Sequence, residues 1–598
     1  MQAVQPAARL SQMLSLTPVA CVAMVAPVLL AFNVPPSATL LNQAVALLGW
    51  GMLLVWLSIS VKPEPNASLD RAPAAAALAA LAILAAAALL AVPRGQPGPL
   101  ALSSAGTLLA AGIALACGVL AGQSRSLRDP IFRSVCVALL CAGLLSTVVA
   151  LVQSYAPSWA DGNWIARPAT PGRAGGNLRQ PNHLSSLLVW SLVALAWLHE
   201  TGLEQPRRAG LLPGRIASFV AMALMTFGIV LTVSRTGMVC VVLLALWGLC
   251  DRSLSRFTRT LLCLAPLLYG LAWLLASSGV QTFAGESQIH RSDPSSSRFG
   301  IWANAMRLIA QHPWAGVGWG EFNFAWTLTP FPGRPGAFFD HTHNLLLQFL
   351  VELGVPLALA VFALLLWALW KSLLAARRGD PVFGGVTTQR TGLVMIVMMA
   401  VHSMLEYPLW YAYFLLPMAF VFGICLGKVR VAGDRADVAA PKLARAVPAV
   451  LQAGAALMVV AAVLVVADYR RVVVIFSPPD NAASLSARIA DGQRSWFFAH
   501  HADYAAGTTA EHPGDELSAL SRASHYLLDT RLMMAWARGL EESGDTDRAR
   551  YVAQRLREFN NSQSDDFFAP CAQRPAAGEA MPFQCLAPGR ALTFEDFR

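Results

Sequence analysis

Charged residues are scarce in this sequence of 598 residues. They make up 13% of it, whereas 56% of the residues are hydrophobic and the mean hydropathy is +0.52. A soluble protein would carry about 25% charged residues. The apolar residues form repeated runs of roughly 18 to 25, the length that a helix needs to cross a hydrocarbon core of about 30 Å. These features exclude an ordinary soluble protein and predict an all-α, polytopic membrane protein.

A convincing small-residue cleavage site is missing after the first apolar run, Leu14 to Phe32. A second run follows closely, so we expect the first to be retained as a span and not removed as a signal peptide. The hydropathy pattern predicts thirteen spans in all. They are residues 14–33, 39–60, 73–92, 100–121, 131–153, 184–198, 211–233, 236–250, 259–277, 344–370, 389–406, 408–428 and 449–467.

The net charge of +10 does not form a basic groove for nucleic acid. From Asp468 to the end the sequence has 14 Arg, no Lys and 18 acidic residues, so this part carries −4 and the remainder +14. If the N-terminus lies inside and the spans alternate, the inner side collects 21 Lys and Arg and the outer loops nine. This is the positive-inside pattern. It predicts a cytoplasmic N-terminus and a tail on the outer face.

Two outward segments are unusually long, and long loops of ordinary composition tend to be functional. We expect a membrane domain over residues 1–467, with a first long loop at 154–183 and a second at 278–343, followed by a tail at 468–598. Helical periodicity in the tail predicts one hairpin of tetratricopeptide type, broken at Gly544. Because a single hairpin cannot bury its own apolar face, we expect it to pack on neighbouring tail or membrane-domain surface.

Eight of the ten cysteines lie in or at the ends of apolar spans, where buried free thiols are expected. Cys571 and Cys585 are the pair in the polar tail. If the tail faces an oxidising compartment, we expect them to form a disulfide.

Lysine is absent from the outward loops of the membrane domain, and all nine positive residues there are arginine. The long loops contain Arg167, Arg173, Arg179, Arg291, Arg298, Arg307 and Arg334. Long loops carry some solvated arginines in any protein, and this is the simplest explanation for most of these residues. Arg235 lies in the tight turn Ser234 to Gly237 between two apolar spans, where a charge needs a reason. A guanidinium there suits phosphate oxygens.

The segment Asp340-His341-Thr342-His343-Asn344 leads into the tenth span. Three interpretations compete: a metal site, a helix cap, or a histidine that acts as general base or donates to a phosphate. The last fits best, so we predict no metal and no other cofactor. Two weaker signals accompany it. Asn177 to His183 gathers amide and imidazole groups at a helix N-terminus, which suits an anion, and Glu406-Tyr407-Pro408 forms a short outward turn.

Together these segments resemble the O-antigen ligase/Wzy superfamily, and specifically the bacterial protein O-oligosaccharyltransferases of PglL type. His343-Asn344 followed by Gly354 is similar to the ligase signature, although Leu357 departs from it, which disfavours a lipopolysaccharide ligase. Other matching segments are Asn177 to His183, Ser234 to Gly237, Arg298 with Trp302 before Pro313 to Phe322, and Glu406 to Pro408. The resemblance covers roughly residues 10 to 560.

The resemblance implies a GT-C-like enzyme of the bacterial inner membrane with a periplasmic active site. The donor would be a glycan on polyprenyl (undecaprenyl) pyrophosphate, and the acceptor a Ser or Thr of an exported or pilin protein. Arg235 and Arg298 would stabilise the leaving pyrophosphate, and His343 would act on the acceptor hydroxyl or on the pyrophosphate. The substrate-binding residues would be Arg179, Gln180, Asn182, His341, Asn344 and Tyr407.

Two other functions remain open on the sequence. One is an O-antigen ligase or polymerase with a glycolipid acceptor; the Gln180-Pro181-Asn182 segment, Tyr407 and the long tail disfavour it. The other is a transporter of lipid-linked sugars. Transporters place ionisable groups near the membrane midplane and often have repeated halves. The absence of an internal repeat, and of charge within most spans, disfavours a transporter.

Overall fold

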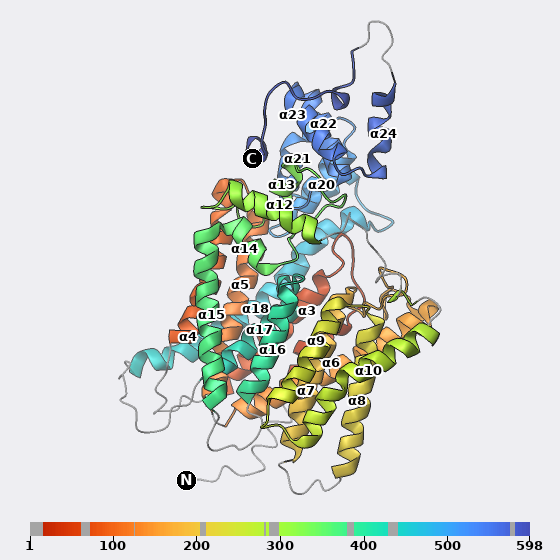
Figure 1. The fold of residues 1–598 in the computed structure, drawn as a ribbon. Helices are drawn as coiled ribbons and strands as arrows, with labels where there is room; N and C mark the ends of the chain where they lie inside the picture. Colours follow the sequence, from red (N-terminus) through yellow and green to blue (C-terminus); the bar gives the residue numbers. More distant parts are fainter. Residues whose placement is uncertain are drawn as a thin grey trace.

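The protein is described from a computed structural model that covers residues 16–60, 72–124, 126–203, 211–279, 283–285, 298–378, 388–427, 441–573 and 580–598. Within these residues the regular secondary structure is helical, and the one β-bridge is isolated, between Thr170 and Arg173. Figure 1 shows a bundle of long helices with the helices of the tail gathered at one end. We call this the tail end of the bundle.

Nine helices of the described chain are long and apolar enough to cross a membrane, which confirms a multi-pass membrane protein. They are α3 (Leu40–Ser60), α4 (Ala72–Leu90), α5 (Gly98–Gln123), α6 (Arg128–Tyr155), α7 (Pro181–Leu203), α8 (Leu211–Leu231), α10 (Arg256–Gly279), α15 (Val355–Arg378) and α18 (Pro441–Phe476).

The predicted number of thirteen spans is not confirmed. Three of the thirteen correspond to shorter apolar helices: Leu16–Leu29, which includes α2 (Ala26–Leu29), α9 (Arg235–Cys250) and α17 (Ala412–Leu426). The predicted span 389–406 corresponds to α16 (Thr388–Ser403), which is in neither group.

Glycines allow α5 and α17 to pack closely in the centre of the bundle. Gly118 and Gly122 on α5 lie against Gly423 and Gly427 at the end of α17, each pair four residues apart. A Cβ atom at Gly118 would lie 2.2 Å from the carbonyl oxygen of Phe420. Small residues at this spacing let helix backbones approach in a membrane, where packing and not hydrophobic burial drives association.

The predicted span 344–370 is two helices, α14 (Leu345–Leu353) and α15. The break is Gly354, whose φ of +76° is unfavourable for other residues. A Cβ atom there would lie 2.4 Å from the carbonyl oxygen of Trp314. The glycine-rich segment of the second long loop therefore packs directly on the break, and Val317 N donates to Val351 O at 2.8 Å. Hydropathy could not reveal this break because both helices are apolar.

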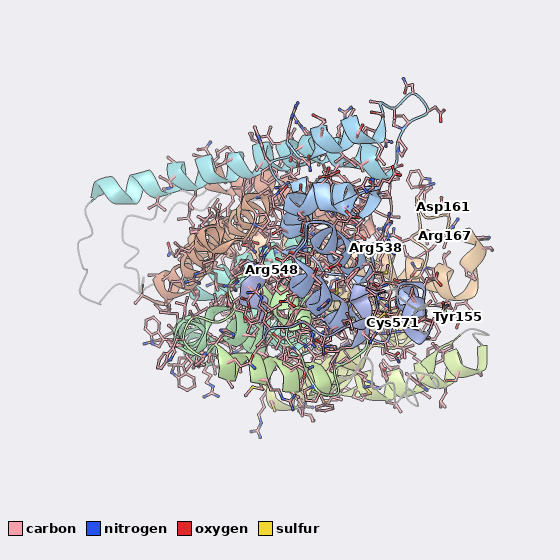
Figure 2. All side chains as sticks on the ribbon, turned by 90° about the horizontal axis from the view of Figure 1, so that it is seen from above. Tyr155, Asp161, Arg167, Arg538, Arg548 and Cys571 are labelled. Carbon is pink, nitrogen blue, oxygen red and sulfur yellow. A yellow bond between two sulfur atoms is a disulfide. The ribbon has the colours of Figure 1, made fainter. Side chains whose placement is uncertain are left out.

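The second long loop forms a layer between the bundle and the tail. Its helices α12 (Arg298–Gln311) and α13 (Phe322–Leu328) lie above α14 and α15 in Figure 1. The tail contains α19 (Leu485–Gly492), α20 (Ala499–Thr509), α21 (Leu517–Ser524), α22 (Thr530–Glu542), α23 (Thr546–Arg557) and α24 (Asp565–Phe568). Of these, α22, α23 and α24 lie above α12 in Figure 1. Seen from above in Figure 2, the tail covers the middle of the bundle, whereas Asp161 and Arg167 of the first long loop lie at its edge.

The predicted hairpin consists of α22 and α23, and the turn at Gly544 has a φ of +85°. Its apolar face shares one core with the second long loop, in which Trp326 contacts Phe559. Cys571 and Cys585 of the tail form a disulfide with Cα atoms 5.2 Å apart, and the other eight cysteines are free.

A buried arginine fixes the second long loop to the tail. The side chain of Arg334 is 1% exposed and forms an ion pair with Glu558 at 3.3 Å. Its guanidinium lies 4.5 Å from the ring centre of Phe559 and 5.0 Å from that of Trp326. Burial lowers the pKa of Arg334 to about 10, and Glu558 opposes this decrease. The sequence predicts that Arg334 is either a solvated arginine or a phosphate ligand. In the structure its contacts are instead with Glu558 and aromatic rings of the protein core.

Replacing Arg334 by Ala should loosen the tail. Glu558 would keep its ion pair with Arg555 at 2.8 Å but lose the buried guanidinium of Arg334, and removing one partner of a buried pair costs up to about 3 to 5 kcal/mol. We expect faster cleavage of the tail by a protease and a lower melting temperature of the purified protein. Arg307→Ala, an exposed arginine on α12, is the matched control and should leave both unchanged. Equal protease resistance of the two variants would contradict an anchoring role.

Candidate active site

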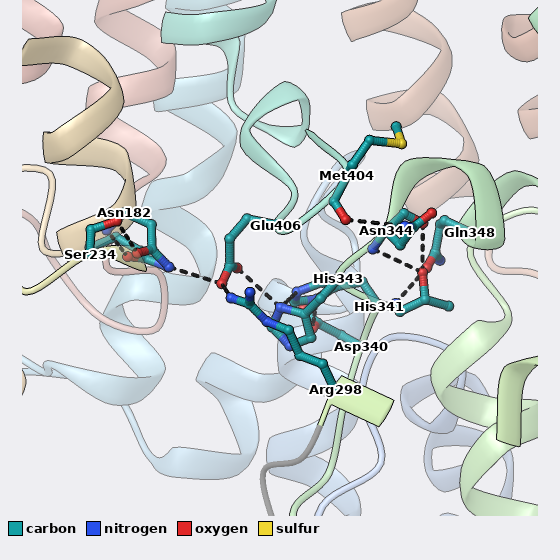
Figure 3. A network of polar contacts seen from close by, with 12 residues as sticks. Asn182, Ser234, Arg298, Asp340, His341, His343, Asn344, Gln348, Met404 and Glu406 are labelled. Atoms are coloured by element: carbon teal, nitrogen blue, oxygen red, sulfur yellow. Dashed lines mark hydrogen bonds and ion pairs between the residues drawn. The ribbon is translucent and has the colours of Figure 1, made fainter. Parts of the chain in front are cut away.

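Glu406 joins three distant segments of the chain at the tail end of the bundle. Its side chain is 5% exposed. Oε1 accepts a hydrogen bond from Asn182 Nδ2 at 2.9 Å and forms an ion pair with Arg298, while Oε2 accepts from His343 Nδ1 at 3.1 Å (Figure 3). Asn182 lies at the start of α7, Arg298 begins α12, and His343 precedes α14. One carboxylate therefore organises both long loops.

Two histidines and two carboxylates form a chain of contacts around Glu406. His341 Nδ1 bonds to Asp340, and His341 Nε2 lies 3.2 Å from His343 Nδ1. A carboxylate only accepts hydrogen bonds, so the network assigns a proton to Nδ1 of both rings. In the described part of the chain no polar group contacts Nε2 of His343, whose side chain is 17% exposed. That nitrogen is left as a proton acceptor facing outward from the network.

The network keeps Glu406 ionised. Burial by itself raises the pKa of Glu406, but the hydrogen bond from His343 and the positive charge of Arg298 outweigh it and lower the pKa to about 2. An ionised Glu406 at neutral pH both holds the guanidinium of Arg298 and fixes the orientation of the His343 ring.

Asn182 connects this network to the turn that carries Arg235. Asn182 Oδ1 accepts a hydrogen bond from Ser234 Oγ at 2.7 Å. Ser234 is also the N-cap of α9, since its Oγ accepts from Gly237 N at 3.1 Å. Arg235, the exposed first residue of α9, is thereby placed beside the residues that surround Glu406.

Backbone strain is concentrated in the same region. Arg179, Val233 and His343 have φ values of 58°, 50° and 55°, in the left-handed region that such residues rarely adopt. Each costs of order 1 to 3 kcal/mol, and such residues cluster at functional sites. Two of the three, Arg179 and Val233, adjoin segments that reach Asn182 or Ser234, and the third is His343 itself.

Asn344 and Gln348 form hydrogen bonds on either side of His343 in the sequence. Asn344 caps α14, and its Nδ2 donates to Met404 O at 3.1 Å, two residues before Glu406. Gln348 Oε1 accepts from Thr342 N at 2.7 Å. Hydrogen bonds therefore fix the backbone on both sides of His343.

The remaining predicted substrate-binding residues lie at different distances from Glu406. Gln180 Oε1 accepts from Asn182 N at 2.8 Å and so fixes the start of α7. The rings of Tyr407 and His341 have centroids 3.4 Å apart. Arg179 is not brought into the network: its guanidinium donates to the carbonyl oxygens of Ala31 and Ala38, because the left-handed backbone directs it towards the segment between α2 and α3.

The other arginines in the described parts of the long loops do not join the network of Glu406. Arg167 donates to Ala160 O at 3.2 Å, and Arg173 donates to Thr232 O at 3.2 Å. Arg307 is exposed on α12. Arg291 lies outside the described residues.

Sequence reasoning missed the central role of Glu406. It noted the turn Glu406-Tyr407-Pro408 but selected Tyr407. A signal was available, because Glu406 is the sole acidic residue between 388 and 427, at the end of an apolar helix. An ionisable residue in that position is a functional candidate in itself.

His341, His343 and Glu406 also have the composition of a metal site. Each offers one ligand atom, and these atoms lie within 4.8 Å of one another. Histidine nitrogen and carboxylate oxygen are zinc ligands. However, both oxygens of Glu406 already accept hydrogen bonds, and the positive charge of Arg298 adjoins them. The charge on Arg298 disfavours a divalent cation at this place.

The chain matches three family models. They are the C-terminal region of virulence factor membrane-bound polymerases over residues 391–567, O-antigen ligase over 220–362, and protein glycosylation ligase over 174–199. All the residues bonded to Glu406 fall within or between these matches. By fold and site the chain is thus a multi-pass membrane protein similar to this group of membrane ligases.

Two curated proteins of Acinetobacter baylyi are similar to the chain. A general O-oligosaccharyltransferase is 26% identical over 347 residues, which cover 54% of this chain and 56% of the relative. A ComP-specific O-oligosaccharyltransferase is 28% identical over 263 residues, which cover 42% and 44%. The chain spans about half the length of the curated relatives it matches. The predicted resemblance to the O-antigen ligase superfamily and its O-oligosaccharyltransferases is therefore confirmed at modest identity.

Proposed function

We propose that this protein is a protein O-oligosaccharyltransferase. It transfers a glycan as one unit from polyprenyl (undecaprenyl) pyrophosphate to Ser or Thr hydroxyls of exported proteins such as pilins. The observation that carries the proposal is the shared carboxylate of Glu406, which sets an arginine and a histidine with a free Nε2 side by side. An acceptor hydroxyl needs a base, and a departing pyrophosphate needs fixed positive charge.

The residues divide the reaction between them. A bond forms between the acceptor oxygen and the anomeric carbon of the glycan, while the bond from that carbon to the pyrophosphate oxygen breaks. The hydroxyl proton moves to His343 Nε2. The electron pair leaves with the pyrophosphate, whose negative charge is stabilised by Arg298 and Arg235. Gln180, Asn182, His341, Asn344 and Tyr407 hold these groups in position or line the substrate path; Arg179 supports the loop from outside the network.

The orientation follows from the charge pattern of the sequence. With 21 positive residues on the N-terminal side and nine on the other, the N-terminus is cytoplasmic, and the network and the tail are periplasmic. We therefore place the protein in the bacterial inner membrane. Residues 1–467 form the transferase domain, and residues 468–598 form a helical region that supports the second long loop.

The experiment is transfer in vitro by the purified full-length protein. Lipid-linked glycan is offered with a pilin-like protein or with a lipid A core, in the presence or absence of a chelator. We expect glycosylation of the protein acceptor, unaffected by the chelator because Arg298 and Arg235 supply the positive charge. Transfer to the lipid alone would indicate an O-antigen ligase. Loss of transfer with the chelator, restored by a divalent cation, would assign a metal to His341, His343 and Glu406.

A further inference from the structure

The tail presents an exposed tyrosine in the turn between α21 and α22. Tyr526 is 43% exposed. His500 of α20 packs on its ring, with centroids 4.2 Å apart and planes inclined at 35°, and His501 meets it edge-on at 5.0 Å. The imidazoles brace one side of the ring, and the remainder is open. An open aromatic ring that is held rigid from behind is a suitable surface for stacking.

Two buried contacts fix this turn to the second long loop. His525 Nδ1 lies 2.9 and 3.0 Å from the two carboxylate oxygens of Glu321. Leu528 N donates to Asn323 Oδ1 at 2.8 Å, and Asn323 Nδ2 donates to Phe339 O at 2.9 Å. A single side-chain amide thus joins the turn of the tail to the residue that precedes Asp340.

Asp340 directly follows Phe339, the residue that the amide of Asn323 links to the turn of Tyr526. The Asp340 side chain is 57% exposed, and one of its oxygens bonds to His341. One side of the Tyr526 ring is open, but burial of the rest raises the pKa of its phenol to about 12. The negative charge of Asp340 contributes to this increase. Because Asn323 bonds to Leu528, two residues after Tyr526, and to Phe339, one residue before Asp340, the aromatic ring and the exposed carboxylate flank the same contact between tail and loop.

We propose that Tyr526 and Asp340 form a sugar-binding subsite for the donor glycan, so that the tail completes the active site. This inference rests on the proposed function. The C–H face of a pyranose ring is apolar and stacks on an aromatic ring, while its hydroxyls donate to a carboxylate. The location fits the first sugars of the glycan, since Asp340 bonds to His341, which contacts His343, the proposed base.

The subsite is tested by measuring the binding of two lipids to the full-length protein in nanodiscs. One probe is undecaprenyl diphosphate carrying a single N-acetylhexosamine, and the other is the same lipid without sugar. We expect Tyr526→Ala to weaken binding of the sugar-bearing lipid roughly three- to tenfold, the range of one aromatic contact, and to leave the sugar-free lipid unchanged. Tyr526→Phe keeps the ring and should bind within twofold of the wild type.

Matched variants separate the subsite from a loss of structure. Trp496→Ala removes an exposed ring elsewhere on the tail and should bind both lipids normally. Tyr526→Leu keeps the bulk without the ring and replaces the alanine variant if that variant unfolds. The subsite is overturned if Tyr526→Ala binds each lipid as tightly as the wild type does. It is also overturned if Tyr526→Ala raises only the KM for the protein acceptor in the transfer assay, because the ring would then contact the acceptor. If the wild type binds the sugar-bearing lipid through Tyr526 but transfers to no hydroxyl, the proposed function fails and the subsite stands.

Discussion

Glu406→Gln should lower kcat for glycan transfer by up to about 10⁴-fold, the loss found when the carboxylate that orients a catalytic histidine is neutralised. The substitution keeps the shape of the side chain but removes its charge. Arg298 then loses its ion pair, and the His343 ring loses the group that fixes its tautomer. The measurement is initial rate of transfer by purified protein at saturating donor and acceptor.

The same change at Glu200 is the matched control. Glu200 lies on α7 like Asn182, but near the opposite end of that helix, where it accepts from Ser255. Glu200→Gln should retain activity. A kcat for Glu406→Gln within threefold of the wild type would remove Glu406 from the mechanism.

The pH dependence of stability gives a second readout for Glu406. The folded protein lowers the pKa of Glu406 from 4.5 to about 2, so its ionised form stabilises the fold above pH 4.5, and this contribution is lost as the pH falls towards 2. The melting temperature of Glu406→Gln should therefore lie below that of the wild type at pH 7, and the difference should narrow at pH 3.

The contrast between Glu406 and the histidine segment shows what the sequence could predict. His343, Arg235 and Arg298 stand in segments whose order along the chain, and whose position at the ends of apolar runs, indicate a common face. Glu406, the residue that joins these segments, could not be predicted in the same way. The contacts of Glu406 depend on how α7, α12 and α16 pack, and a single carboxylate in a short turn is equally compatible with an interfacial position.

Arg334 and Gly354 illustrate the same limit in the fold. Hydropathy correctly predicts apolar helices around Gly354, but the break depends on a left-handed glycine against the Trp314 carbonyl, and hydropathy does not register such a contact. An arginine in a long loop is normally solvated. Arg334 is buried because Phe559 and Glu558, more than two hundred residues later, enclose it. Contacts between elements distant in sequence decide both cases.

His343→Gly should reduce kcat by about 10²- to 10⁴-fold, the usual contribution of a general base. Glycine is the better substitution for removing the imidazole, because residue 343 has a φ of 55°, which glycine adopts without strain and alanine does not. His343→Ala should lose as much activity and also melt at a lower temperature, while it still inserts into the membrane. His512→Ala, which removes an exposed histidine of the tail, is the control and should be fully active.

Added imidazole distinguishes the two roles open to His343. If Nε2 accepts the hydroxyl proton, free imidazole that diffuses into the space left by His343→Gly should restore part of kcat, and the KM for the donor should change little. If His343 instead holds the pyrophosphate, the donor KM should rise and imidazole should not restore the rate. Because Glu406 still fixes Arg298 in this variant, any rescue reports the imidazole itself. Full transfer by the folded glycine variant without imidazole would show that neither role belongs to His343.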